Sequence, residues 1–336
     1  MRNKFVTFTL SILFQFGLAA AATADVLVAE EAAILRYNNS GVLQGVFNSG
    51  GPTPDGFSAM IRGGNGNVYA LSGSSQVYEY DRFTGAYIRT FVDGSTQGFT
   101  DIKTMAFGRD GNFYLGTGDV GTVERYDGNT GAFLNTFLAA GAGAASGSQQ
   151  LSEVMSLAFG TDGMLYVGND SRRLGEGYSV LRFDATTGSF VDAIVADSAN
   201  GLYDPNALVF GPDGKLYVSS EGLNRFTDST IMRFDPATGS YLGNLVSAHS
   251  GGLEEPYGFA FGPDGYLYTT STDTGQILRY DATTGSFFDV FIGLGLADPK
   301  AILFDVPEPS GLALAALALV LAGRAGAVRQ RRKTSP

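Results

Sequence analysis

Short apolar runs joined by Asp-Gly or Asn-Gly turns recur through the middle of the chain. Four copies align directly, at residues 105–114, 157–166, 208–217 and 259–268, and a weaker copy covers residues 61–69. The turn glycines have successive spacings of 45, 52, 51 and 51 residues, at Gly66, Gly111, Gly163, Gly214 and Gly265. Because Asp, Asn and Gly tolerate the left-handed backbone of a tight turn, each copy predicts a β-hairpin.

A second hairpin is predicted after each first one. Its leading strand ends in an aromatic residue and Asp, as in Tyr280-Asp281, and its turn ends in Thr-Gly, as in Thr284-Gly285. Two hairpins in a unit of about 50 residues are typical of a four-stranded β-propeller blade. The Asp before each Thr-Gly accepts backbone N–H groups, so this motif indicates turn chemistry rather than a calcium repeat.

The two ends of the repeat region together supply the four strands of one more blade. After the fifth unit, residues 301–305 offer a single strand, and residues 26–29, 34–38 and 41–47 offer the three strands that it lacks. We therefore predict an all-β fold, a six-bladed β-propeller over residues 25–305, closed by N- and C-terminal strands.

The repeat resembles the NHL-type and regucalcin/gluconolactonase-like (SGL-type) six-bladed propellers. The segments Asp204-Pro205-Asn206-Ala207 and Glu255-Pro256-Tyr257-Gly258 precede innermost strands and are similar to the Pro-x-Gly segment of those blades. The resemblance implies an architecture and leaves the activity open, because propellers include binding modules, lyases, lactonases and scaffolds.

Residues 1–24 have the pattern of a secretory signal peptide. Arg2 and Lys4 precede a mostly apolar run over residues 5–19, and Ala22-Thr23-Ala24 supplies small residues for cleavage. This order predicts export of a mature chain that begins near Asp25.

Residues 306–336 carry a second targeting pattern. Pro307, Glu308 and Pro309 precede an uncharged apolar run over residues 311–323, and five basic residues follow it. This order resembles the PEP-CTERM sorting signal of Gram-negative bacteria. The resemblance implies a transmembrane sorting helix, anchoring in the inner membrane, processing by an exosortase-type enzyme, and delivery to the cell surface or extracellular matrix. A plain C-terminal membrane anchor is the alternative.

Composition narrows the chemistry. The 336 residues include one His, no Cys and no Trp, which excludes thiolate metal sites, disulfides and multi-histidine sites. Residues 25–306 contain 15 basic and 32 acidic residues, a net charge of 15 − 32 = −17. Such a surface repels phosphate backbones, so we expect no nucleic acid partner.

Acidic residues predict a metal site on one face of the ring. Counting seven or eight residues past the turn glycines, and to the end of the N-terminal strand, gives Glu31, Asp119, Asp170, Glu221 and Asp273. The loops after second strands share one face, so these carboxylates could bind Ca²⁺ through oxygen ligands. Ordinary solvated turn carboxylates are the alternative.

Two matching insertions predict ligand contacts beside these acids. Residues 171–178 and 222–229 supply Arg and aromatic side chains, and a lead-in segment supplies an amide; the set is Arg172, Arg173, Tyr178, Asn206, Arg225 and Phe226. Solvent-exposed decoration is the alternative.

Two functions follow from these features. The leading hypothesis is an exported, surface-sorted propeller that acts as a non-catalytic binding or structural module of the envelope or extracellular polymer, with an extracellular polysaccharide or surface protein as partner. The alternative is a Ca²⁺-dependent hydrolase or lactonase that uses the acidic face. No other cofactor is expected.

Overall fold

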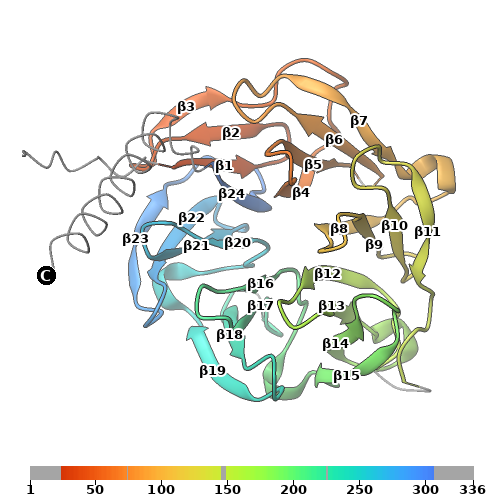
Figure 1. Cartoon of the computed structure of the whole chain (residues 1–336). Coiled ribbons are helices and arrows are strands. Elements are labelled where there is room, and N and C mark those ends of the chain that lie inside the picture. Colours follow the sequence, from red (N-terminus) through yellow and green to blue (C-terminus); the bar gives the residue numbers. More distant parts are fainter. Residues whose placement is uncertain (1–23, 74, 145–148, 225, 306–336) are drawn as a thin grey trace, which may run out of the picture. The chain divides into compact units, whose positions relative to one another are not determined.

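The chain forms a closed ring of β-sheets. The computed structural model describes residues 24–305, except residues 74, 145–148 and 225. Within these residues, 24 strands form six antiparallel sheets of four strands each, placed around a central axis (Figure 1). The predicted six-bladed β-propeller is therefore confirmed. Residues 1–23 and 306–336, with the expected signal peptide and the sorting residues Pro307, Glu308 and Pro309, lie outside the described residues.

The blades are numbered here from the one that contains both ends of the ring, and their strands are given from the inside outwards. Blade 1 consists of β24 (Ala301–Asp305), β1 (Asp25–Ala29), β2 (Ile34–Tyr37) and β3 (Leu43–Val46). Blade 2 consists of β4 (Phe57–Arg62), β5 (Val68–Ser72), β6 (Gln76–Tyr80) and β7 (Tyr87–Asp93). Blade 3 consists of β8 (Ile102–Phe107), β9 (Phe113–Thr117), β10 (Val123–Tyr126) and β11 (Phe133–Leu138).

The remaining blades repeat this order. Blade 4 consists of β12 (Val154–Phe159), β13 (Met164–Asp170), β14 (Tyr178–Asp184) and β15 (Phe190–Val195). Blade 5 consists of β16 (Leu208–Phe210), β17 (Leu216–Ser220), β18 (Thr230–Phe234) and β19 (Tyr241–Val246). Blade 6 consists of β20 (Phe259–Phe261), β21 (Tyr266–Ser271), β22 (Gln276–Asp281) and β23 (Phe287–Ile292). Short 3₁₀ turns lie in four connections, at η1 (Gly94–Gln97), η2 (Arg172–Leu174), η3 (Ala199–Gly201) and η4 (Ser250–Gly252).

Blade 1 closes the ring as predicted. Strand β24 pairs with β1 from Asp25 opposite Asp305 to Ala29 opposite Ala301, so the last strand of the ring is the inner strand of the first blade. Arg62 of blade 2 lies 2.8 Å from the Asp305 carboxylate, and Arg36 lies within 3.8 Å of both aspartates. These cations neutralise two carboxylates that pairing places side by side.

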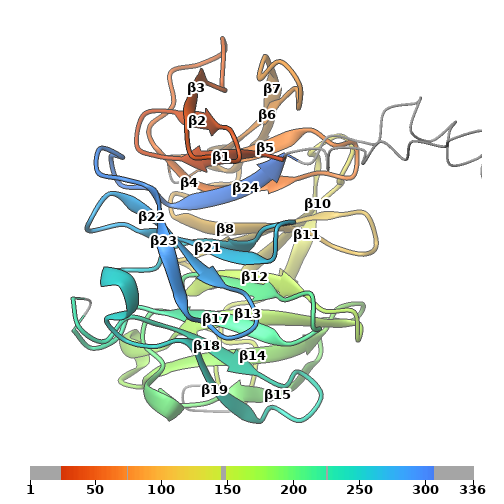
Figure 2. The ribbon, with the colours of Figure 1, turned by 90° about the vertical axis from the view of Figure 1, so that its left-hand side faces the viewer.

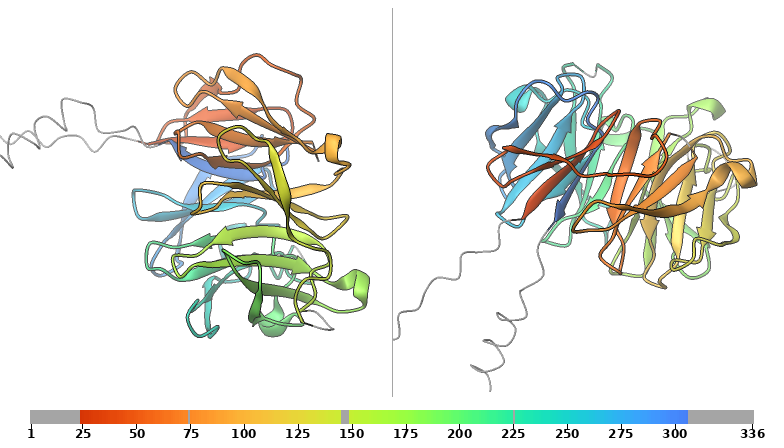
Figure 3. Two further views of the ribbon diagram at one scale, coloured as in Figure 1. Left: turned by 45° about the vertical axis from the view of Figure 1, so that its right-hand side comes forward. Right: turned by 90° about the horizontal axis from the view of Figure 1, so that it is seen from above.

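The hydrophobic core lies between the blades. Among the described residues, each of six buried clusters combines side chains of two neighbouring sheets, and Figures 2 and 3 show these sheets stacked face to face. Within these clusters, tyrosines of second strands pack edge-on or tilted against inner-strand phenylalanines of the next blade, with ring centroids 4.9–5.2 Å apart. The pairs are Tyr69–Phe107, Tyr114–Phe159, Tyr166–Phe210, Tyr217–Phe261 and Tyr268–Phe304.

The same tyrosines are fixed at their hydroxyl ends. Tyr268 donates to the Asp264 carboxylate at 2.7 Å, and Asp264 belongs to the Asp-Gly turn of the same blade. Tyr114, Tyr166 and Tyr217 make the equivalent hydrogen bond to Asp110, Asp162 and Asp213. Burial and the accepting carboxylate raise the pKa of Tyr114 to about 12. The Phe-Gly-x-Asp-Gly-x-x-Tyr repeat is therefore a packing motif between blades.

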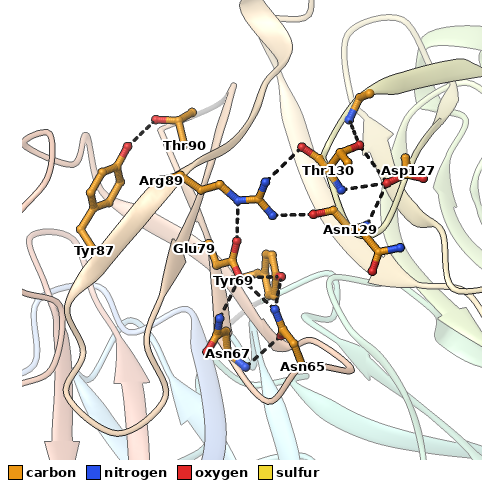
Figure 4. A network of polar contacts seen from close by, with 11 residues as sticks. Asn65, Asn67, Tyr69, Glu79, Tyr87, Arg89, Thr90, Asp127, Asn129 and Thr130 are labelled. Atoms are coloured by element: carbon orange, nitrogen blue, oxygen red, sulfur yellow. Dashed lines mark hydrogen bonds and ion pairs between the residues drawn. The ribbon is translucent and has the colours of Figure 1, made fainter.

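In blade 2 the carboxylate that accepts from the tyrosine comes from the third strand and not from the turn (Figure 4). Its turn has Asn65 in place of Asp, and a carboxylate comes instead from Glu79 of β6, which is only 3% exposed. Glu79 accepts hydrogen bonds from Asn65, Asn67, Tyr69 and Arg89 at 2.7–2.9 Å. In blades 4 and 6 the third strand carries Arg and the fourth carries Asp, whereas blade 2 has Glu79 and Arg89 at these places.

Arg89 also ties blade 2 to blade 3. Its guanidinium donates to the backbone carbonyls of Asn129 and Thr130 in the Thr-Gly turn of the next blade, at 2.6 and 3.3 Å (Figure 4). One side chain thus satisfies a buried carboxylate and two backbone acceptors.

The Thr-Gly turns approach the preceding blade closely. Gly285 has a φ of +72°, and a Cβ atom there would overlap the carbonyl oxygen of Leu245 in β19. Gly265, in the Asp-Gly turn of the same blade, has a φ of +87° but nothing within 4 Å of a Cβ position. An alanine would therefore be strained by the left-handed backbone at both positions, but it would overlap a neighbouring atom only at Gly285.

We predict that Gly285→Ala destabilises the propeller more than Gly265→Ala does. Left-handed strain costs about 1–2 kcal/mol at either site, and overlap with the preceding blade adds about 1–3 kcal/mol at Gly285 alone. Chemical denaturation of the two variants measures the difference. Equal losses of unfolding free energy would contradict the close approach.

A second prediction concerns Glu79. Burial raises its pKa, but four hydrogen bonds outweigh burial and hold the pKa below its usual 4.5. The carboxylate therefore stabilises the fold above pH 4.5, and this contribution is lost as the pH falls through the lowered pKa. We expect Glu79→Gln to lower the unfolding free energy by about 2 kcal/mol near neutral pH, and the difference from wild type to shrink below about pH 4.

Urea unfolding across this pH range measures the effect, with the exposed Glu176→Gln as control. A difference between wild type and Glu79→Gln that stays constant with pH would show that the Glu79 charge does not stabilise the fold.

Candidate functional site

One residue from each blade occupies an equivalent position where the chain enters the inner strand. These residues lie eight positions before the turn glycine of their repeat, as Tyr257 does before Gly265, with Lys300 at the matching place in blade 1. The set is Ser58, Lys103, Met155, Asn206, Tyr257 and Lys300. All except Met155 line a cavity of about 150 Å³ on the central axis. We call these six residues and the acids two positions before them the channel mouth.

Two local devices direct these side chains into the channel. In blades 2, 3 and 4 the pairing of the inner strand skips one residue, which makes Ser58, Lys103 and Met155 β-bulge residues. A bulge turns one side chain away from the regular alternation of its strand. In blades 5, 6 and 1 the residue follows an acid and a proline instead, as in Asp204-Pro205-Asn206.

Those three acids have an uncommon backbone conformation. Asp204, Glu255 and Asp298 have φ values of 45°, 48° and 55°, in the left-handed region that residues other than glycine seldom adopt. The strain recurs at the same position of three consecutive blades. Repeated strain of this kind concentrates at functional sites, where the surrounding fold holds it in place.

The acids of the mouth alternate with cations. Lys103 lies 2.9 Å from Asp101, and Lys300 lies 2.9 Å from Asp298 and 4.0 Å from Glu255. Two arginines from the loop after β13 complete the ring of charges, with Arg173 at 3.6 Å from Glu153 and Arg172 at 3.6 Å from Asp204. With Asp170, which lies 2.7 Å from Arg172, these residues have a net charge of 4 − 6 = −2, so cations neutralise most of the mouth acids on a strongly acidic propeller.

Burial changes the acid–base chemistry of two mouth residues. Burial raises the pKa of the Glu153 carboxyl, against the opposing effect of Arg173. Burial, followed by the nearby carboxylates of Asp298 and Glu255, raises the pKa of Tyr257 to about 12. Tyr257 is therefore a neutral hydroxyl at physiological pH, and Lys300 lies over its ring at 4.2 Å from the centroid.

Three polar groups of the cavity have no side-chain hydrogen bond within the part of the chain that the structure describes. They are the Asn206 amide, the Tyr257 hydroxyl and the Ser58 hydroxyl. The Ser58 Oγ is also fully buried. A buried polar group without a partner costs about 1–3 kcal/mol. Asn206 and Tyr257 are only half-buried, so their polar groups are available to a ligand or to water.

The predicted contact residues have different surroundings. Asn206 lines the cavity, and Arg172 and Arg173 lie beside the mouth, as expected. Tyr178 is only 2% exposed and packs in the core between blades 4 and 5, beneath the Arg172 guanidinium. Phe226 is half exposed, in the loop between β17 and β18. Arg225 lies outside the described residues.

The acids predicted as metal ligands are not brought together. Asp170 is buried against Arg172 at 2.7 Å, and Asp119 is exposed and accepts from Thr100. Glu31 and Asp273 are exposed, and Glu221 is half-buried. Within residues 24–305, apart from the gaps given above, no three Asp, Glu or His side chains lie close enough to hold a metal ion together. These residues therefore do not fit a calcium site.

The sequence analysis did not predict the acids of the channel mouth as site residues, although they lie at a constant spacing from the turn glycines. Four of them lie ten residues before the turn glycines, at Asp101, Glu153, Asp204 and Glu255. The prediction counted forward from each glycine to the loop after the second strand. Counting backward reaches the start of the inner strand, which lies nearer the axis.

Membrane spans were also expected from the sequence. No helix among the described residues is long and apolar enough to cross a membrane. The expected sorting helix lies outside these residues.

Chelation tests the fit to calcium. Because lysine and arginine side chains already engage the mouth carboxylates, we predict the same melting temperature in EDTA and in excess Ca²⁺, and no saturable heat on calcium titration. Saturable binding with a raised melting temperature would contradict this prediction and would favour a Ca²⁺-dependent hydrolase.

Comparison with known proteins supports the fold. No protein-family model and no curated protein matches the chain. A chain of the nidogen/laminin complex is similar with a TM-score of 0.64 and 14% identity, over 84% of this chain and 98% of that one. The periplasmic gluconolactonase PpgL of Pseudomonas aeruginosa is similar with a TM-score of 0.56 and 15% identity, over 85% and 100%. A candidate 6-phosphogluconolactonase of Bacteroides uniformis has a TM-score of 0.57 and 16% identity, over 84% and 99%. At these identities the likeness shows the fold alone: a six-bladed propeller with NHL-type and lactonase-like structural neighbours.

Proposed function

We propose that this protein is an exported, surface-sorted propeller that acts as a non-catalytic binding module of the cell envelope or extracellular polymer. The pattern of residues 1–24 supports export. The Pro307-Glu308-Pro309 triplet, with the apolar run and basic tail that follow it, supports sorting by an exosortase-type enzyme in a Gram-negative bacterium. An extracellular polysaccharide fits this location, and the channel mouth is the proposed binding site.

The observation that carries the proposal is the set of unpartnered polar groups around one small cavity. The Asn206 amide and the Tyr257 and Ser58 hydroxyls can donate and accept, and the lysine ammoniums of Lys103 and Lys300 can donate. Sugar hydroxyls need both kinds of partner. A cavity of about 150 Å³ matches a single ring-sized group, since cavities of this size take up benzene. The mouth therefore suits one sugar unit at the end of a chain.

The charge of the mouth agrees with such a ligand. Each cation there stands beside a carboxylate, so the site lacks the strong field that a highly charged ligand would need. Paired charges held at fixed distances still give strong, directional hydrogen bonds to neutral hydroxyl groups. Specificity then comes from geometry.

Lactone hydrolysis at the same mouth is the second candidate function. Two structural neighbours are named as lactonases, and Glu153 has a carboxyl of raised pKa that is 14% exposed. A carboxylate there could take a proton from water as the water adds to a lactone carbonyl, and it would return this proton to the ring oxygen as the ring C–O bond breaks. This candidate is proposed without a metal.

Calorimetry with short oligosaccharides tests the binding function. We predict saturable binding to the propeller unit, which closes its own ring and core over residues 24–305. Asn206→Ala and Tyr257→Phe should each weaken binding about five- to tenfold, because each removes hydrogen bonds in a partly desolvated site.

Tyr241→Phe is the matched control, because Tyr241 donates its hydroxyl to Asn244 on the outer strand β19 and should not affect binding. Binding that survives both mouth substitutions would move the site elsewhere. Turnover of gluconolactone that is lost in Glu153→Gln would favour the hydrolase.

A further inference from the structure

Three consecutive inner strands place two ammonium groups on one side of the mouth. Lys300 lies directly before β24, Ser58 is the second residue of β4, and Lys103 is the second residue of β8. Strand β4 stands between β24 and β8 in the ring (Figure 1), so the position of Ser58 along the mouth falls between the positions of the two lysines. All three residues line the same cavity. We call them the lysine arc.

The two ammoniums have capacity left for a ligand. The Lys300 side chain is 18% exposed and the Lys103 side chain is 29% exposed, so solvent screens them only partly. An ammonium has three N–H donors. Each lysine has one carboxylate at 2.9 Å, Asp298 or Asp101, so donors of both remain for an acceptor in the cavity.

Ser58 adds an independent sign of a ligand. Its Oγ is buried and has no hydrogen-bond partner among the described residues, although the bulge in β4 turns this residue out of the regular pairing. If the Ser58 side chain turns toward the cavity, an acceptor atom between the two lysines would satisfy this hydroxyl together with both ammoniums.

The rest of the mouth has a different character. Tyr257 lies beside Lys300, whose ammonium is 4.2 Å from its ring centroid, and Asn206 belongs to the blade before it; both supply neutral polar groups. The cavity thus has two ammonium groups on one side, each beside a carboxylate, and neutral polar groups on the other. A ligand with an anionic group at one end and hydroxyl groups at the other matches this asymmetry.

We propose that the sugar unit bound at the mouth is a uronic acid, with its carboxylate on the lysine arc and its hydroxyls on Asn206 and Tyr257. This inference rests on the proposed binding function. The charge count favours a carboxylate over a phosphate. The two ammoniums already face Asp101, Asp298 and Glu255, so a ligand with a single negative charge meets less repulsion from these acids than a dianion would.

Calorimetry with D-glucuronate and D-glucose as matched probes tests the proposal on residues 24–305. We expect glucuronate to bind about tenfold tighter than glucose at low ionic strength, and this preference to diminish as salt is added. Lys103→Met with Lys300→Met should remove the preference, because glucuronate binding then falls by a larger factor than glucose binding, which keeps its contacts to Asn206 and Tyr257. Ser58→Ala should weaken glucuronate binding more than glucose binding.

Lys215→Met is the control, because Lys215 pairs with Asp235 beside the turns on the other side of the blade and should leave the preference unchanged. Equal affinity for the two sugars, or a preference that survives the double lysine substitution, would overturn the uronic acid assignment while leaving the binding function standing. Absence of binding by either sugar and by oligosaccharides would overturn both. Melting curves of each variant show whether it is folded.

Discussion

The ring depends on a tyrosine that recurs in the second strand of its blades and makes one contact with its ring and another with its hydroxyl. In five of the six blades, a second-strand tyrosine packs its ring on the next blade and donates its hydroxyl to a carboxylate of its own blade. The hydroxyl bond fixes the position of the ring within its blade, and the aromatic contact fixes the angle to the next blade. Since each repeat makes the same contact, the blades have nearly the same relation to one another, and the ring closes.

The sixth interface uses other means. Blade 1 has Leu27 in its second strand, where the other blades have tyrosine, and this side chain is fully buried against blade 2. The buried cluster around Leu27 and the Arg62–Asp305 ion pair hold this interface together, while pairing of β1 with β24 closes blade 1 itself. Blade 2 then carries the reversed pair of Glu79 and Arg89. Both departures from the repeat lie next to the closure, where the two chain ends meet.

Regular spacing of the blades also forms the mouth. The tyrosine contacts set the position of each inner strand, and the bulges and the acid-proline segments then aim one side chain per blade at the axis. Residues that are far apart in the chain, such as Ser58 and Lys300, therefore line one cavity. Left-handed strain at Asp204, Glu255 and Asp298 is held by the surrounding sheets.

Much of the architecture was predictable from the sequence, because turn glycines at regular spacing report the strands directly. The split sixth blade followed from counting strands at both ends. The site was less predictable. A bulge depends on how many residues the partner strand offers, so the sequence around Lys103 does not reveal it. Tyr178 was expected at the surface, but it begins β14 and packs on Tyr203 with ring centroids 4.7 Å apart. Asn206 was predicted from its segment, and it lines the cavity.

A crystal structure of residues 24–305 with a uronic acid oligosaccharide tests the central claim most directly. The account predicts a terminal sugar in the channel mouth, with its carboxylate at hydrogen-bond distance, about 2.7–3.2 Å, from Lys103, Lys300 and the Ser58 hydroxyl. A sugar bound on the outer strands or on the loops, with the channel free of it, would contradict the account.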